Sequence, residues 1–439
     1  MSSDFDSDYD SELVKTAIFH IKVGEIDTAR RYLERALDVA DDEETRAQAS
    51  LWLSEITSDP AQKRSLLETV LAWDSNNAQA RRALLILDGK LKPEEIVDAD
   101  HLPAETGGQV QAASPDRFTC PNCGARMVFA PDGHSLYCEH CSRNETLADQ
   151  FDSKEPAERD FLLAMATAQG HRKPVAMHSF QCKGCGATFL LAPEVISATC
   201  SYCGSPHVIA VDESRELIEP DGVIPFAFEQ KNAGQYLVKW ATKKKVKPDG
   251  KVQMPKGIYL PVWSFSLGGE ISYTAQIVVN ESRGRKVVIK TITDNYPVLA
   301  SDVPVAATRK FGKLLESALA GFKLAEAVPY DPRFLSDWLA EVYEISMSDA
   351  SLDARKKVYD KTQHEAAIML GTQGNVENFR SSSSRMSVES FKLILAPLWL
   401  ASYAVEGKSY NVLVNGQSGA VVGETPSLDL LGWVENILK

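Results

Sequence analysis

All eight cysteines of the chain lie between residues 117 and 210, in two copies of one spacing pattern. The first copy is Cys120-x2-Cys123 followed by Cys138-x2-Cys141, and the second is Cys182-x2-Cys185 followed by Cys200-x2-Cys203. Fourteen residues separate the two inner cysteines in each copy. Two thiolates three residues apart can hold one metal ion, and two such pairs complete a tetrahedral four-sulfur site. The pattern therefore predicts two zinc ions, each held by four cysteines.

A site with four sulfur ligands has no open coordination position, so its zinc is predicted to stabilise folding rather than to activate water. Paired cysteines without a secretion signal favour zinc over disulfides, because thiols stay reduced in the cytoplasm. An alternative is a redox switch in which the cysteine pairs oxidise as zinc leaves. Three nearby histidines, His134, His140 and His207, are assigned to the surface or to packing, since each site already has four ligands.

Each cysteine set must be positioned by a hairpin, which gives one zinc ribbon at 117–145 and another at 179–210. The second ribbon has a glycine after both cysteine pairs, Gly186 and Gly204, which suits the tight turns that close on a metal. The first has Gly124 but carries Ser142 at the other place, a departure that loosens that turn. Residues 146–178 are predicted to form a helical connector, with its helix beginning near Pro156.

The part before the ribbons is acidic and helical. Residues 1–12 read as an acidic tail, or alternatively as a short motif for a basic partner, with Phe5 and Tyr9 among the acids. Residues 13–97 have helical periodicity and repeat at an interval of 34 residues, which resembles the tetratricopeptide repeat (TPR). The aligned pairs are Ala17 with Leu51, Leu33 with Leu67, Ala36 with Val70 and Leu37 with Leu71. Lys63 breaks the pattern, and a plain helical bundle is the alternative; residues 98–116 read as a linker.

Residues 211–439 are predicted to form an α+β domain with a mainly antiparallel sheet. The helix signals lie at about 230–244, 308–321, 333–342 and 349–369. The strand signals lie at about 258–279, 286–293, 388–404 and 409–423. Two segments resemble each other, with Pro261 aligned to Pro397 and Trp263 to Trp399, so the domain contains either a duplicated hairpin or two convergent strand starts.

The chain resembles a bacterial family of uncharacterised zinc-ribbon proteins over roughly residues 117–428. The shared stretches are the paired ribbons, Tyr259-Leu-Pro-Val-Trp263, Tyr330-Asp-Pro-Arg-Phe-Leu335, Pro397-Leu-Trp-Leu400 and the hairpin Val414-Asn-Gly-Gln-Ser-Gly419. Members of this family are often labelled as primosomal replication-restart helicases. A helicase needs a glycine-rich phosphate loop, but before Gly407-Lys408-Ser409 the required glycine is replaced by Ser402. We therefore expect no motor activity.

Composition limits the remaining classes. Hydrophobic residues make up 44% and charged residues 24% of the 439 positions, as in globular proteins of several units. The net charge of −13 resides almost entirely in residues 1–116, which have 12 basic and 24 acidic residues. The ribbons are nearly neutral, and no apolar run is long enough to span a bilayer. We expect a cytoplasmic protein without membrane insertion.

No nucleophile, base and orienting group appear at recognisable motifs, and Asp294, Asp302, Tyr330 and Asp331 are not paired into a site by sequence. We therefore expect a non-enzymatic zinc-binding scaffold or adaptor, which contacts a protein partner or a second copy through its helical repeats. The alternative is a nucleic-acid-binding accessory protein that uses the ribbons and the Lys243–Lys247 run. Trp240 would then stack a base, unless this stretch is simply a lysine-rich helix C-terminus with a buried Trp240.

Overall fold

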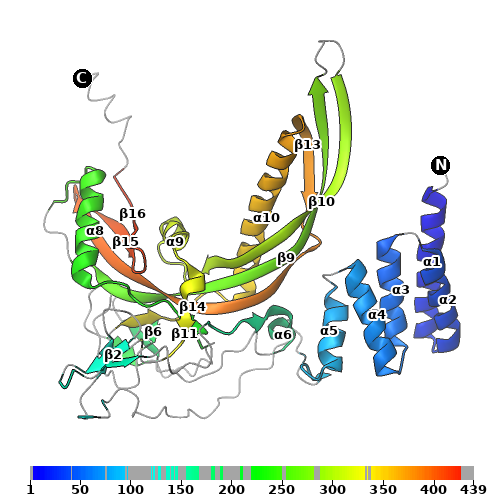
Figure 1. Ribbon diagram of the computed structural model, residues 1–439, viewed down its shortest axis with the longest axis horizontal. Helices are drawn as coiled ribbons and strands as arrows, with labels where there is room; N and C mark the ends of the chain where they lie inside the picture. The colour runs from blue at the N-terminus through cyan, green and yellow to red at the C-terminus, as the bar shows by residue number, and fades with distance from the viewer. Residues whose placement is uncertain are drawn as a thin grey trace.

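The computed structural model describes residues 3–40, 42–74, 77–93, 96, 120, 122–123, 127–129, 135–138, 140–142, 144–146, 155–167, 179–182, 188–190, 208–210, 219–249, 254–280, 287–331, 334 and 338–426. The predicted linker at 98–116 lies outside these residues. The described chain forms an N-terminal group of helices and a large, mainly antiparallel sheet with helices at both ends (Figure 1). No described helix is long and apolar enough to cross a bilayer.

The N-terminal helices are α1 (Ser3–Lys22), α2 (Ile26–Val39), α3 (Glu43–Glu55), α4 (Pro60–Trp73) and α5 (Ala78–Leu87). Each helix contacts the next, and α1 also contacts α3. The start of α3 is capped by Asp42, whose carboxylate accepts a bond from the Thr45 amide, and α4 starts at Asp59 followed by a proline at the first helical position. Small and branched buried residues such as Ala17, Leu33 and Leu67 then form the helical cores.

The acidic segment at the N-terminus is helical, where a solvated tail was expected. α1 begins at Ser3 and continues to Lys22, with two basic residues in its last turn. Acidic residues near a helix N-terminus and basic residues near its C-terminus both interact favourably with the helix dipole.

Two long neighbouring strands, β9 (Lys256–Asn280) and β14 (Met386–Val405), form the centre of the sheet. They pair antiparallel, with Leu260 opposite Ala396 at the middle. Pro261 follows Leu260 and Pro397 follows Ala396, so the two similar segments are related by an approximate two-fold axis through this pair. The structure thus supports an internal duplication of the hairpin over a chance resemblance.

The duplication extends to the short strands beside the central pair. β8 (Gly222–Val223) runs parallel to β14, and β12 (Leu339–Glu341) runs parallel to β9. The two pairings are equivalent, because each begins opposite an isoleucine of the central strand, Ile394 for β8 and Ile258 for β12.

Backbone hydrogen bonds repeat in the same way. The Ala307 amide donates to the Pro261 carbonyl at 3.1 Å, and the Gly416 amide donates to the Pro397 carbonyl at 2.8 Å. The carbonyls of Ala307 and Gly416 in turn accept bonds from the segments that precede the long helices of the two halves. Both halves are therefore built from the same unit.

Each half places its helix on the hairpin of the other half. α8 (Gln230–Lys243) packs on β15 (Lys408–Asn415) and β16 (Val421–Gly423). α10 (Met347–Gly371) packs on β9, on β10 (Val287–Ala306) and on β13 (Asn375–Ser382). Figure 1 shows α8 and α10 at opposite ends of the curved sheet. This exchange ties the two halves into one body.

Several predicted elements of this body differ in the structure. The helix expected at 333–342 is wrong in its described part, because Leu339–Glu341 form β12 between β9 and β6 (Thr188–Leu190). β13 has no predicted counterpart, since its only apolar residues, Val376 and Phe379, are three positions apart and give no strict alternation. α9 (Gly312–Leu319) covers only the second part of the helix signal at 308–321.

The connector and the strands of the predicted second ribbon are joined to this body by strand pairing. β4 (Arg159–Asp160) pairs with β14, and the helix α6 that follows is short (Phe161–Ala166) and contacts α5 of the helical arm. Its N-cap is Asp160 rather than a residue near Pro156, because the Asp160 carboxylate accepts the Leu163 amide at 2.8 Å. β6 pairs with both β12 and β5 (Ser179–Cys182), which also pairs with β7 (Val208–Ala210).

Candidate metal centre

The four cysteines of the first ribbon lie together in the structure. β1 (Met127–Phe129), β2 (Ser135–Cys138) and β3 (Asn144–Thr146) form a small antiparallel sheet with β2 in the middle. Cys120 and Cys123 precede β1, whereas Cys138 ends β2 and Cys141 follows in the turn to β3. The four Sγ atoms all lie within 4.8 Å of one another.

These distances fit a zinc ion with four thiolate ligands. A tetrahedron with Zn–S bonds of about 2.3 Å requires sulfur atoms about 3.8 Å apart. The Sγ atoms of Cys120 and Cys141 are 3.5 Å apart, and those of Cys123 and Cys138 are 3.4 Å apart. The cluster can therefore hold one zinc ion with a small adjustment and with no position left for a water ligand.

The metal site has one side toward the body and one toward solvent. Cys120 and Cys138 are buried, while Cys123 is exposed and Cys141 is half-buried. The two buried cysteines belong to the same apolar cluster as Phe226 and Trp399 of the body. Two of the four predicted metal ligands are therefore packed in the same apolar cluster as side chains of the body.

Ser142 closes the second turn of the ribbon in a left-handed conformation, with φ of 55°. Its amide donates to the Cys138 carbonyl at 2.8 Å, which holds the turn against the end of β2. The equivalent position of the predicted second ribbon is Gly204. The alignment of the two cysteine sets therefore identifies a position that favours glycine. His140 is exposed, and His134 and His207 lie outside the described residues.

The second cysteine set is described only in part. Cys182 ends β5, and Cys185, Cys200 and Cys203 lie outside the described residues. The strands around the set are present as β5, β6 and β7, in antiparallel pairing. The second four-cysteine site therefore stays a prediction.

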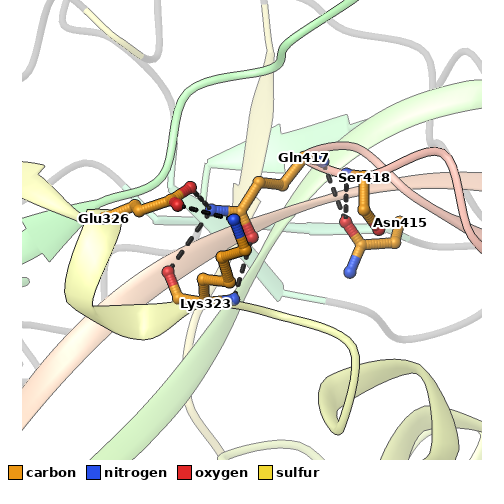
Figure 2. A network of polar contacts seen from close by, with 5 residues as sticks. All are labelled: Lys323, Glu326, Asn415, Gln417 and Ser418. Carbon is orange, nitrogen blue, oxygen red and sulfur yellow. Dashed lines mark hydrogen bonds and ion pairs between the residues drawn. The ribbon is translucent and has the colours of Figure 1, made fainter.

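A second polar cluster surrounds the tip of the last hairpin (Figure 2). The Asn415 carboxamide oxygen accepts the amides of Gln417 and Ser418, both at 2.9 Å. Gln417 accepts the Lys323 amide at 3.0 Å and donates to Glu326 at 2.9 Å. The hairpin was predicted from the sequence. These bonds show that its tip is also hydrogen-bonded to residues 323–326, which follow α9.

A buried lysine fastens the connector to β14. The ammonium of Lys392 lies 3.1 Å from Glu158 and 3.0 Å from Asp302, and only 11% of its side chain is exposed. Hydrogen bonds and ion pairing with these carboxylates raise the pKa of Lys392 although burial opposes the shift. A lysine held protonated in this way serves as a cation and not as a base.

The other polar residues named from the sequence are not brought into one catalytic arrangement. Asp302 accepts a bond from Ser264 at 3.0 Å in addition to the Lys392 contact, and the Asp294 carboxylate accepts the amide of its neighbour Asn295. Burial raises the pKa of Tyr330, whose hydroxyl has no hydrogen-bond partner in the described structure.

Lys243, Lys244 and Lys245 are exposed at the end of α8, whereas Trp240 is 9% exposed and contacts Tyr403. The interpretation of this stretch as a lysine-rich helix terminus with a core tryptophan is therefore supported. A base cannot stack on Trp240 in this conformation.

Comparison with known proteins agrees with the geometry of the first cysteine set. Residues 120–144 match the NADH pyrophosphatase zinc ribbon domain. The chain is also similar to the uncharacterised protein YdjG of Bacillus subtilis, with 26% identity over 330 residues that cover 70% of this chain and 89% of the relative. No solved structure matches significantly. The chain therefore contains a zinc ribbon of the NADH pyrophosphatase type.

Proposed function

We propose that the protein is a non-enzymatic scaffold of the cytoplasm, in which two structural zinc ions fix the joints between a partner-binding helical arm and the duplicated sheet. The observation that carries the proposal is the closed four-cysteine cluster, which leaves zinc no position for a substrate or water. The match to a pyrophosphatase ribbon covers only residues 120–144.

The helical arm supports a TPR-like interpretation. α2 begins at Ile26 and α4 at Pro60, and they end at Val39 and Trp73, so both ends are displaced by 34 residues. Helical hairpins repeated at this interval stack into surfaces that bind partner proteins. The arm also continues into the rest of the molecule, because α5 contacts α6 and an isolated bridge joins Ile96 to Thr167.

The ribbons support the role of joints. The second ribbon is continuous with the large sheet, since Leu190 and Phe189 of β6 pair with Ala340 and Glu341. Phe189 is fully buried. We propose that this ribbon binds the second zinc ion through Cys182, Cys185, Cys200 and Cys203, as the repeated spacing predicts.

The proposal is tested by crosslinking the full-length chain in cells and measuring which proteins are captured. Glu44 and Glu55 are exposed on α3 of the arm, and Glu316 and Glu377 are exposed on the body. Capture of a specific partner should be lost in a Glu44→Lys/Glu55→Lys chain and kept in a Glu316→Lys/Glu377→Lys chain. A native chain that captures no protein would contradict partner binding through the arm. Capture of the same partner by the native chain and by both variant chains would contradict it as well.

Binding of nucleic acid is a second candidate, favoured by the exposed lysines at the end of α8. Affinity for DNA or RNA should then fall steeply with salt and be lost when Lys243, Lys244 and Lys245 are replaced. The burial of Trp240 removes the residue that would stack a base, so this candidate rests on charge alone.

A further inference from the structure

The β9–β10 hairpin leaves one edge of the large sheet open. Between Ser272 and Val278, β9 pairs with β13 on one side and with β10 on the other. Among the strands that the structure describes, β10 pairs with β9 alone. Figure 1 shows this hairpin extending past the end of α10. β10 is therefore an edge strand, and the backbone of an edge strand can bind a further strand.

One pair of the β9–β10 ladder shows which backbone groups face this edge. Glu270 of β9 lies opposite Pro297 of β10. The Glu270 amide donates to the Arg385 carbonyl at 3.2 Å. Arg385 directly precedes β14, which pairs with β9 on the side away from β10. Glu270 and Pro297 are therefore a pair without mutual hydrogen bonds, and Pro297 has no amide hydrogen to leave unpaired.

The same alternation fixes the direction of the residues before Pro297. Pairs with and without hydrogen bonds alternate along an antiparallel ladder. The register is unbroken from Val287 to Ala300. Every second residue before Pro297 therefore directs its amide and carbonyl to the open edge, namely Asn295, Thr293 and Thr291. The Asn295 amide donates to the Asp294 carboxylate at 2.8 Å, which suits an amide with no strand opposite it.

The two charged side chains in this part of β10 lie on one face. Side chains of a strand alternate between faces, so Lys290 and Asp294 share the face of Ile292, two positions before and after it. Ile292 packs against the core cluster that includes residues of α10. Lys290 and Asp294 are exposed, and neither forms an ion pair with another described residue. One positive and one negative charge therefore flank Ile292 at equal spacing.

Proline, register shifts and charge are features that protect an edge strand from pairing. Pro297 and a register shift after Ala300 protect the second half of β10. The stretch Ile289–Asn295 contains neither a proline nor a shift. Charges oppose pairing with a strand that places like charges opposite them, but Lys290 and Asp294 differ in sign. A strand that matches this stretch is therefore the same stretch running in the reverse direction.

We propose that β10 of one copy pairs antiparallel with β10 of a second copy about a two-fold axis at Ile292. Lys290 of each copy then lies opposite Asp294 of the other, and Thr291 lies opposite Thr293. Opposite charges and paired threonines on neighbouring strands are both stabilising. A register centred on Asp294 would instead place that carboxylate against its own copy. The contact uses the same surface of both copies, so it closes a dimer.

Backbone hydrogen bonds form along the same register. Thr291 and Thr293 both face the open edge, so each exchanges amide and carbonyl bonds with the other residue in the second copy. The Asp294 carboxylate turns from the Asn295 amide to the second copy, and the freed amide donates to the Ile289 carbonyl opposite it. This association goes beyond the proposed scaffold function, because no residue of the helical arm or of the cysteine sets takes part in it.

Charge reversal in the full-length chain tests the dimer and its register together. Lys290→Glu and Asp294→Lys each place like charges opposite each other in the dimer, whereas the double variant Lys290→Glu/Asp294→Lys restores opposite charges in exchanged positions. Thr293→Pro removes an amide that faces the open edge. Lys408→Glu and Glu316→Lys are matched controls at exposed positions outside β10. Molar mass is measured by sedimentation over a range of concentrations, and circular dichroism checks that each chain is folded.

The native chain and both controls should sediment as concentration-dependent dimers. Each single charge variant and Thr293→Pro should dimerise at least ~10-fold more weakly, and the double charge variant should regain most of the native affinity. That recovery excludes misfolding as the cause of the single losses, since the double variant contains both substitutions. A native chain that stays monomeric would overturn the inference. Single variants that dimerise as well as the native chain, or a double variant no stronger than the single ones, would overturn it too.

Discussion

Trp263 and Trp399 occupy equivalent positions in the two halves of the sheet, but only one of them has a hydrogen bond from its indole. The Trp263 Nε1 group donates to the Ile345 carbonyl at 2.9 Å, whereas the buried Trp399 Nε1 has no partner in the described structure. Each ring contacts an equivalent aromatic residue, Tyr343 at 5.3 Å and Phe226 at 4.8 Å between centroids. The two halves therefore share this aromatic contact and differ in the hydrogen bonding of the indole.

This difference predicts unequal effects of one substitution. Trp263→Phe leaves the Ile345 carbonyl without its donor, while Trp399→Phe removes a donor that was already unpaired. Both indoles are fully buried, so Trp263→Phe should destabilise the chain by about 1–2 kcal/mol more than Trp399→Phe. Chemical denaturation of the two variants measures the difference, and equal losses would contradict the assigned hydrogen bonding.

The left-handed backbone of Ser142 predicts a stabilising substitution. A residue with a side chain pays a conformational penalty at positive φ that glycine does not, so Ser142→Gly should stabilise the first ribbon by up to about 1 kcal/mol. Retention of zinc against a chelator reports on this ribbon. The matched control is Ser135→Gly in β2, which should weaken zinc retention. If the Ser142→Gly chain lost zinc more readily than the native chain, the left-handed conformation of the turn would be contradicted.

The ion pair of Lys310 with Glu341 predicts a large loss when only one partner is removed. Only 1% of the Glu341 side chain is exposed, and the Glu341 backbone pairs with Phe189 of β6. Lys310→Met removes the ammonium group that pairs with this buried carboxylate, which should cost about 3–5 kcal/mol.

The double variant Lys310→Met/Glu341→Leu should recover most of that loss, because no buried charge then remains. Urea unfolding of four chains, namely the native chain, Lys310→Met, Glu341→Leu and the double variant, gives the coupling energy. A double variant as unstable as the sum of the single ones would show that the two side chains do not interact.

Glu158 predicts an acid-sensitive attachment of the connector. A hydrogen bond from Ser390, followed by the contact with Lys392, lowers the pKa of Glu158 from 4.5, although burial opposes the shift. The unfolded chain then binds the proton more readily than the folded chain. The stabilisation is therefore present above about pH 4.5 and is lost as the pH falls through the lowered pKa.

Hydrogen exchange of residues 155–167 should increase below this pH in the native chain. A Glu158→Gln chain should lack this dependence, and the exposed Glu316→Gln control should keep it. Identical acid profiles for the native and Glu158→Gln chains would contradict the assigned role.

Much of the sheet could be predicted from sequence, because its long strands carry continuous apolar runs. Leu393 to Leu400 are buried on both faces of β14, which gives a strong signal whatever the neighbouring strands are. α10 and α8 were predicted for a similar reason, since each has a regular buried stripe. The first metal site was predicted because cysteine spacing alone specifies a local ligand set.

Contacts between distant segments could not be predicted in this way. Nothing in the pattern of Leu339–Glu341 distinguishes a short strand from a helical turn, because its conformation is decided by pairing with β9 and β6. The exchange of helices between the halves likewise depends on tertiary packing, although the repeated Pro-x-Trp segments gave a signal of the duplication. The fastening of Gln417 to Lys323 and Glu326 joins residues about ninety positions apart.

The proposal that two closed zinc sites form the joints of the scaffold is tested most directly by metal content. Purified native chain should contain two zinc ions, and a Cys123→Ser/Cys138→Ser chain should contain one, because the second ribbon keeps its four cysteines. Loss of the first zinc should also unfold that ribbon, since metal binding contributes ~10 kcal/mol or more to the folding of such modules. A native chain with one zinc ion or none, measured by elemental analysis, would contradict the paired-site account.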